Sequence, residues 1–263
     1  MPAINYTATS APAVNLGLRN WTDRARQLGS LVGWWTLHSG RWTEEAVAGV
    51  QRITGCAARV GEQPLTKTSA SLGPRPATIG GLSCADFTTG ELNGLHLDQV
   101  VQRDNVGVVA ILGLGSVAPV QNRDLIGLYG NGDAIRVWRT GAGNWNWRVG
   151  STEAAGGTFA WAEGPLMVIA QRIGTAVALR LRSRTATGAV LTGAMTTASV
   201  PTAVKVILGQ DEISDGHVNA APNASRAWSE YWYEAAIHAG PVLTDPDVLA
   251  FWDDYFTTVY GAA

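Results

Sequence analysis

The sequence predicts an all-β fold, an antiparallel sandwich of two sheets with a short helix before it and one helix after it. From Leu31 onward, short apolar or alternating segments recur between turns rich in Gly, which is typical of the strands of a sandwich. Near the end of the chain the apolar residues change to helical spacing. Because 46% of the 263 residues are hydrophobic and only 15% are charged, the chain can bury a full core and is not predicted to be disordered.

Composition and alternation place the strands. Leu31–Leu37 (LVGWWTL) is the first, and Val106–Leu114 is apolar throughout, so we expect it to be buried on both faces. Residues 130–133 (GNGD) predict a hairpin turn, and prolines and glycines predict a loop-rich stretch over 54–83. The remaining strands are predicted at Ala85–Thr88, Leu125–Tyr129, Ala134–Arg139, Asn144–Val149, Pro165–Arg172, Thr175–Arg184, Val204–Gly209 and Ser229–His238.

The two ends of the chain differ from the sandwich. Residues 2–15 predict an extended arm, and Leu16–Leu28 predicts a short amphipathic helix, which either docks onto a partner or packs on its own sandwich. At the other end, Thr244 as the cap and Pro246 in the first turn predict the start of a helix that stops at Gly261. We therefore divide the chain into an attachment segment (1–30) and a sandwich domain (31–263).

Charge and composition exclude several classes of function. A net charge of −2 lacks the basic excess of a nucleic-acid-binding protein. No window is long and apolar enough for insertion into a membrane, and no signal peptide is recognisable, so synthesis in the bacterial cytoplasm is expected. Cys56 and Cys84 either form one disulfide or remain as buried thiols, and two cysteines cannot alone make a structural zinc site. No organic cofactor is predicted.

Several segments resemble the concanavalin A-like and laminin G-like jelly-roll superfamily. LVGWWTL is similar to the opening strand of that group, GLSCADFT to the short strand that follows, and VKVILGQ to its Gly-ended strand. The strand pair PLMVIAQRIGTAVALRLRSRTATG and the closing strand, turn and helix from Trp228 to Tyr260 complete the likeness, which covers Leu31 to Gly261. The resemblance implies a jelly-roll fold, which hosts lectins, glycanases and adhesion modules alike.

A narrower likeness concerns the whole chain. A sandwich behind a short N-terminal arm, with an arginine-rich composition, resembles the spike or fibre proteins of tailed phages and the head spikes of gene transfer agents. The likeness implies a place on the surface of a virion or phage-like particle, with residues 1–30 bound to other particle proteins. A bacterial surface or capsule polysaccharide is the expected partner of the sandwich.

The sequence offers little evidence of catalysis. Glycanases of the resembled fold carry a Glu-x-Asp-x-x-Glu strand motif, which this chain lacks. Glu230 and Glu234 form the best carboxylate pair, on one face of a predicted strand, with solvated edge residues as the other interpretation. We therefore predict a protein that is not an enzyme, with a divergent glycoside hydrolase as an alternative. Calcium is a further option that the resemblance implies, with Asn131, Asp133, Asp211 and Asp215 as candidate ligands.

Two surfaces are candidates for glycan binding. In the first, aromatic rings could stack on sugar rings while planar polar groups hold hydroxyls, and Trp138 is expected to be more exposed than the other two tryptophans, which alternation can place in the core. Its residues are Trp138, Trp145, Trp147, Asn144, Asn146 and Arg148. The second is a ridge formed by Arg180, Arg182 and Arg184 at about 7 Å spacing on one strand face, which could bind an acidic polysaccharide or be a solvated sheet edge. A structural virion protein without glycan binding is the other alternative.

Overall fold

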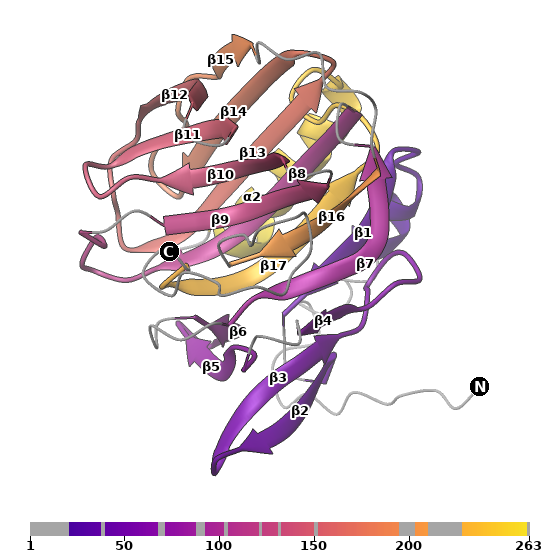
Figure 1. The fold of residues 1–263 in the computed structure, drawn as a ribbon, viewed down its shortest axis with the longest axis vertical. Coiled ribbons are helices and arrows are strands. Elements are labelled where there is room, and N and C mark those ends of the chain that lie inside the picture. The colour runs from indigo at the N-terminus through magenta and orange to yellow at the C-terminus, as the bar shows by residue number, and fades with distance from the viewer. Residues whose placement is uncertain are drawn as a thin grey trace.

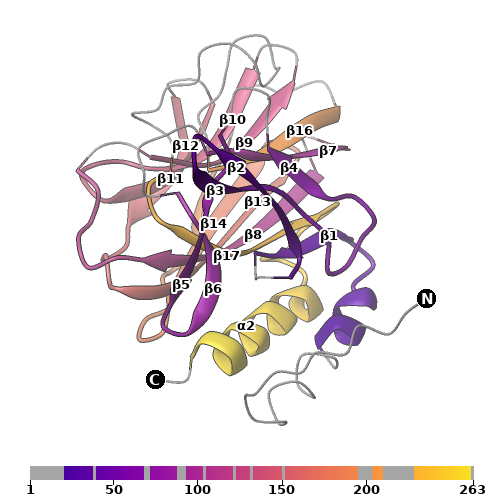
Figure 2. The same ribbon diagram turned by 90° about the horizontal axis from the view of Figure 1, so that it is seen from below.

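Two antiparallel sheets form the body of the protein. The computed structural model describes residues 21–37, 40–67, 72–87, 93–102, 105–120, 123–130, 133–149, 152–194, 203–209 and 228–261. Within these residues every strand pairing is antiparallel, and the sheets form two layers with a helix outside one of them (Figures 1 and 2). The predicted all-β, antiparallel architecture is confirmed.

The strands divide between the two layers as follows. The first sheet has the order β15 (Leu191–Ala194), β14 (Ala176–Ser183), β13 (Gly164–Ile173), β8 (Asn105–Leu114), β17 (Tyr231–His238), β6 (Leu82–Asp86) and β5 (Arg75–Ile79), and β1 (Leu31–Thr36) also pairs with β17. The second sheet has the order β12 (Thr152–Thr158), β11 (Asn144–Val149), β10 (Asp133–Arg139), β9 (Arg123–Gly130), β16 (Ala203–Leu208), β7 (Leu95–Gln102), β4 (Leu65–Lys67), β3 (Val50–Cys56) and β2 (Trp42–Val47).

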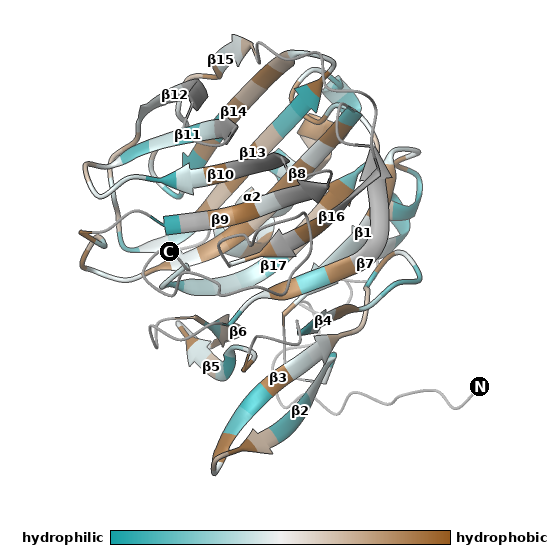
Figure 3. Cartoon of the chain, viewed as in Figure 1, coloured by the Kyte–Doolittle hydropathy of each residue, from teal (hydrophilic) through white to brown (hydrophobic). Residues whose placement is uncertain are grey.

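The first sheet is buried on both faces, which explains why its central strands are apolar throughout. On β8, Val108 and Ala110 belong to a core between the two sheets, whereas Val109 and Ile111 belong to a second core on the other face. We call these the inter-sheet core and the helix-side core. Hydrophobic residues run along β13 and β14, whereas the projecting β2–β3 hairpin mixes hydrophilic and hydrophobic residues (Figure 3). The prediction that Val106–Leu114 is buried on both faces is confirmed.

Helix α2 (Pro246–Tyr260) covers the outer face of the first sheet. The side chain of Asp245, and not that of Thr244, caps the helix by accepting hydrogen bonds from the amides of Asp247 and Val248 at 3.1 Å. The predicted cap was therefore one residue too early, while Pro246 in the first turn and Gly261 at the end agree with the prediction. The buried face of the helix consists of Val248, Phe251, Trp252, Tyr255, Phe256 and Tyr260.

The short helix over residues 21–26 packs against α2. The indole of Trp21 meets the rings of Phe251 and Tyr255 edge to face, at centroid distances of 5.6 and 5.4 Å. Arg24 pairs with Asp254 at 3.2 Å, and Figure 2 shows the two helices side by side. Of the two predicted alternatives for this helix, the described residues take the one in which it packs on its own sandwich.

The strands and the cysteines show where the sequence was uninformative. The stretch over 54–83, predicted to be loop-rich, contains β4 and β5. Pro76 is accommodated because β5 lies at a sheet edge, where the missing N–H of proline costs no hydrogen bond.

Cys56 and Cys84 are buried free thiols, so they do not form the disulfide that was one of the alternatives. Among the described helices, none has both the length and the apolar character needed to span a membrane.

Candidate functional site

The predicted aromatic surface lies largely inside the protein. Trp145 and Trp147 belong to the inter-sheet core, as the alternation of β11 allowed, and the Trp147 indole donates to the carbonyl of Ala178 at 3.0 Å. Trp138 lies on the strand next to them and is only 5% exposed, so the expectation that it is the exposed tryptophan was wrong. Alternation assigns Trp138 to the face opposite the core, but it does not reveal that this face is covered.

The polar residues of the predicted aromatic surface differ in how deeply they are buried. Asn146 is the cross-strand partner of Trp138 and is completely buried, whereas Asn144 is half-buried and its backbone N–H donates to the Thr140 hydroxyl at 3.1 Å. The side chain of Arg148 lies outside the described part of the structure. The structure thus places Trp138 and Asn146 side by side but does not present them as an open stacking surface.

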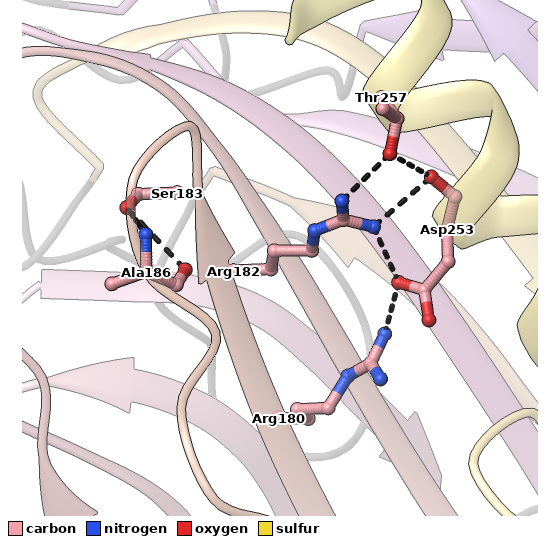
Figure 4. Close-up of polar contacts among 6 residues, drawn as sticks. All are labelled: Arg180, Arg182, Ser183, Ala186, Asp253 and Thr257. Atoms are coloured by element: carbon pink, nitrogen blue, oxygen red, sulfur yellow. Dashed lines mark hydrogen bonds and ion pairs between the residues drawn. The ribbon is translucent and has the colours of Figure 1, made fainter.

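The arginine ridge on β14 binds helix α2. Arg180 and Arg182 both contact one carboxylate oxygen of Asp253, at 2.5 and 2.9 Å, and Arg182 also donates to the Asp253 carbonyl at 3.0 Å (Figure 4). Arg182 reaches the Thr257 hydroxyl at 2.6 Å, and Arg184 donates to the Tyr260 carbonyl at 2.6 Å. The face of β14 that alternation assigns to solvent is therefore occupied by the closing helix.

The predicted carboxylate pair is separated by the sheet. Glu234 is buried on the helix side, where Trp34 Nε1 donates to it at 2.5 Å and the hydroxyls of Tyr255 and Tyr260 donate at 2.5 and 2.6 Å. Glu230 instead contacts the amide of Gly115 at 2.9 Å, at the end of the sandwich. A register shift between Trp232 and Glu234 breaks the alternation that would have put both carboxylates on one face.

Glu230 is at the centre of a polar cluster where the two sheets end. Gly115 follows β8, Arg123 begins β9 and Arg139 ends β10, and the register of β9 and β10 places the two arginines directly opposite each other. The indole N–H of Trp161, in the connection from β12 to β13, donates to the Gly115 carbonyl at 2.8 Å. We call Gly115, Arg123, Arg139, Trp161 and Glu230 the sandwich-end site.

The contacts within this site join an aromatic ring to charged groups. The Arg139 guanidinium lies over the Trp161 ring at 4.6 Å and donates to the carbonyl of Pro119 at 3.1 Å. Arg139 is only 3% exposed, whereas Arg123 and Trp161 are half-buried. An indole next to guanidinium and carboxylate groups offers both a stacking face and hydrogen-bonding groups to a polar ligand.

Burial controls the electrostatics of the sandwich-end site. It raises the pKa of Glu230 above its ordinary value, while the Gly115 amide and the positive charges of Arg123 and Arg139 act in the opposite direction and Asp86 adds to the rise. Burial also lowers the pKa of both arginines, and the carboxylate of Glu230 partly offsets this effect. Perturbed carboxyl groups beside charged partners are a common property of functional sites.

The loop that follows Gly115 carries exposed apolar residues. In the loop from β8 to β9, Val117 is 77% exposed and Val120 is 87% exposed, and this loop is attached to the cluster through Gly115 and Pro119. Isolated exposed valines are ordinary on a surface loop, so they do not by themselves indicate a ligand.

The sequence identified only part of this site. Glu230 was singled out, but Trp161 was not among the candidate residues, and Arg123 and Arg139 carried no local signal because they meet only through strand pairing. Of the candidate calcium ligands, Asn131, Asp211 and Asp215 lie outside the described residues, as does the side chain of Asp133. Among the residues that the structure does describe, no group of three or more His, Cys, Asp or Glu could hold a metal ion.

Comparison with solved structures identifies proteins of similar fold. A sialidase of Trypanosoma rangeli matches with a TM-score of 0.55 at 9% identity, over 92% of this chain and 39% of the sialidase. An arabinofuranosidase complexed with arabinofuranosyl-α-1,2-xylobiose matches with a TM-score of 0.53 at 13% identity, over 88% of this chain and 64% of the enzyme. The chain thus corresponds to less than two thirds of either protein, and at these identities the likeness concerns the fold.

The comparisons also correct one prediction. No protein-family model matches the sequence, and no curated protein is significantly similar to it. The structures of similar fold are those of glycoside hydrolases, and a second arabinofuranosidase structure, of a mutant, matches with a TM-score of 0.55 at 14% identity. The prediction that the chain is not an enzyme is contradicted by these neighbours, which are all-β proteins that act on sugars.

Proposed function

We propose that this protein recognises glycans and that the sandwich-end site is where it binds them. The observation that carries the proposal is the half-buried indole of Trp161 beside the buried guanidinium of Arg139 and the carboxyl group of Glu230. An aromatic face can stack on a sugar ring while charged groups bind its hydroxyls. The names of the proteins of similar fold, a sialidase and an arabinofuranosidase, support a sugar as the ligand.

A glycan array with the whole chain tests this proposal, with affinities then measured for the best saccharide. Trp161→Ala should weaken binding by at least about tenfold, because aromatic residues at the centre of a site contribute more than 1 kcal/mol. Trp42→Ala is the matched control, because Trp42 is also half-buried but lies on the β2–β3 hairpin. Absence of any saccharide binding, or equal loss in both variants, would contradict the proposal.

Hydrolysis of the bound glycan is a second candidate function, favoured by the position of Asp86. Asp86 ends β6 as the cross-strand partner of Tyr231, next to Glu230, and its charge helps to raise the pKa of Glu230. Most glycosidases use two carboxyl groups, one of which must be protonated to act as the acid. Release of reducing sugar from bacterial polysaccharides, abolished by Glu230→Gln and by Asp86→Asn, would support this function. Retention of full sugar release in both variants would exclude Glu230 and Asp86 as the two catalytic carboxyl groups.

The finer assignments implied by the sequence resemblance belong to the same proposal. We propose a jelly-roll sandwich of the concanavalin A-like and laminin G-like kind, bound to a bacterial surface or capsule polysaccharide. Residues 1–30 would attach it to a virion or phage-like particle. The support for this part is the resemblance alone. Electron microscopy of purified particles with an antibody against the sandwich tests it, and particles without label would contradict it.

A further inference from the structure

Arg139 is enclosed by its neighbours, although it belongs to the sandwich-end site. It is only 3% exposed, and its guanidinium lies over the Trp161 ring at 4.6 Å while Nη1 donates to the Pro119 carbonyl at 3.1 Å. In the turn from β10 to β11, a Cβ atom on Gly143 would lie 3.7 Å from Nη2. A glycan that reaches the exposed part of the site therefore meets the neighbours of Arg139 and not Arg139 itself.

The indole of Trp161 is held by two specific contacts. Its N–H donates to the Gly115 carbonyl at 2.8 Å, and the Arg139 guanidinium covers its face. The hydrogen bond fixes one point of the ring, and the contact on the face opposes rotation about that point. Trp161 also packs against the inter-sheet core, but it lies in a connection without strand pairing. These side-chain contacts therefore set the orientation of the ring.

An arginine at position 139 is costly for the fold. Arg139 is the cross-strand partner of Trp145, which belongs to the inter-sheet core, so its side chain leaves β10 on the core face. Its Nε has no acceptor among the described residues. A buried guanidinium with an unused donor lowers stability, and apolar residues of similar volume are often tolerated as well or better. Packing alone therefore does not account for an arginine here, which points to a role in the site.

We propose, on the basis of the proposed function, that Arg139 is a positioning residue that holds the Trp161 indole in the orientation in which a glycan stacks on it, without touching the glycan. A cation over the face of an indole is attracted by the ring, and the attraction strengthens when water is excluded. The hydrogen bond to Pro119 fixes the guanidinium in turn. A ring that is already in place loses less conformational entropy on binding, which raises the affinity.

The first test measures the Trp161 ring in the absence of any glycan. NMR of the isotope-labelled whole chain follows hydrogen exchange of the indole N–H groups with water, and Trp161→Phe identifies the Trp161 signal among those of eleven tryptophans. Arg139→Met retains an unbranched apolar side chain and should accelerate exchange at Trp161 by about twofold to thirtyfold, the range expected for loss of a cation–π contact. Trp34, whose indole donates to Glu234 in the helix-side core, should keep its exchange rate.

Arg172→Met is the matched control. Arg172 is also a buried arginine that donates to a backbone carbonyl, that of Gly174 at 2.9 Å, but it lies at the end of β13 away from Trp161. This variant should leave exchange at Trp161 unchanged. Urea unfolding of Arg139→Met should show no large loss of stability. A large loss with faster exchange at all indoles would mean that Arg139 supports the whole fold, which overturns the inference.

A double-mutant cycle connects the ring to binding. Calorimetry with the saccharide that binds best on the glycan array gives the affinities of the wild type, Arg139→Met, Trp161→Ala and the double variant. Arg139→Met should weaken binding by about threefold or more in the wild type and have no further effect in Trp161→Ala, because a positioning residue acts only through the ring. Arg139→Lys, which retains a cation, should weaken binding less than Arg139→Met.

The outcomes separate this inference from the proposed function. If Arg139→Met weakens binding equally with and without the Trp161 ring, or leaves exchange at Trp161 unchanged, Arg139 does not act by positioning that ring and the inference is wrong. In both cases a weaker binding of the saccharide by Trp161→Ala still supports the proposed function. Absence of all saccharide binding contradicts the proposed function itself, and the role of Arg139 in binding fails with it.

Discussion

Glu230 and Glu234 are four residues apart in sequence but lie on opposite sides of the first sheet. Glu230 contacts the Gly115 amide and interacts with arginines of the second sheet, whereas Glu234 binds the hydroxyls of Tyr255 and Tyr260 on the outer side. The register shift in β17 between Trp232 and Glu234 causes the separation. One carboxylate therefore belongs to the sandwich-end site, and the other connects the sheet to α2.

Loss of the Glu234 carboxylate should destabilise the whole fold. Glu234→Leu leaves the indole N–H of Trp34 and two tyrosine hydroxyls without their acceptor, which should lower the free energy of unfolding by about 3 kcal/mol or more. Glu234→Gln keeps one carbonyl acceptor and should cost less. Urea unfolding measures both, with exposed Glu44→Gln as a control expected to change stability by less than about 0.5 kcal/mol. A loss for Glu234→Leu no larger than that of the control would be inconsistent with this role.

Protonation of His238 should destabilise the protein in mild acid. Its Nε2 accepts from the Trp252 indole at 3.0 Å, so the ring proton is on Nδ1, which lies 2.9 Å from the Ser30 hydroxyl. Burial lowers the pKa of His238 from 6.5 to about 4, and the charge of Asp245 partly opposes this. Between these values the unfolded chain binds the extra proton, so stability is complete above pH 6.5 and falls as the pH decreases toward 4, by about 3 kcal/mol.

The comparison of wild type with His238→Gln isolates this contribution. Glutamine can also accept from Trp252 and donate to Ser30, but it does not titrate, so the variant should lose less stability than the wild type between pH 6.5 and 4. Carboxylates that titrate in the same range affect both proteins and cancel in the difference. If the stabilities of the two proteins fall in parallel with pH, burial does not lower the pKa of His238 in the folded state.

Asp253 should matter more for stability than its neighbour Asp254. Asp253 accepts from both Arg180 and Arg182 and is 31% exposed, whereas Asp254 is 62% exposed and pairs with Arg24 alone. Asp253→Asn should lower the free energy of unfolding by about 1–3 kcal/mol, and Asp254→Asn by less than about 1 kcal/mol. Thermal and urea unfolding provide the measurement, and equal effects of the two substitutions would show that the shared ion pairs do not fix α2.

Both cysteines should be unreactive in the folded protein. Burial raises the pKa of Cys56 and of Cys84 to about 12, with Asp86 adding to the rise at Cys84, so almost no thiolate is present at pH 8. An aromatic disulfide reagent should label neither thiol in the native protein and both thiols in denaturant without reductant. Labelling that appears only after reduction would mean that the two cysteines form a disulfide.

Local sequence patterns predicted most of the first sheet and its closing helix. Val106–Leu114 and Pro165–Arg172 were recognisable as strands because burial on both faces requires apolar residues at every position. The start of α2 was recognisable from its capping residues and Pro246, within one residue. In contrast, β4 and β5 are short and lie in a stretch rich in Gly and Pro, so their pairing rather than their composition makes them strands.

In strands without a register shift, such as β14, the sequence by itself determined which residues share a face, because side chains alternate along an extended backbone. It therefore placed Val177 and Leu179 together and Arg180 with Arg182 on the other side. Only the tertiary structure decided what covers each face, and helix α2 converted the arginine ridge from a candidate glycan surface into an attachment for the helix. It also decided, through the register of β9 and β10, that Arg123 meets Arg139 near Glu230. Such contacts join distant segments, so no local pattern in the sequence encodes them.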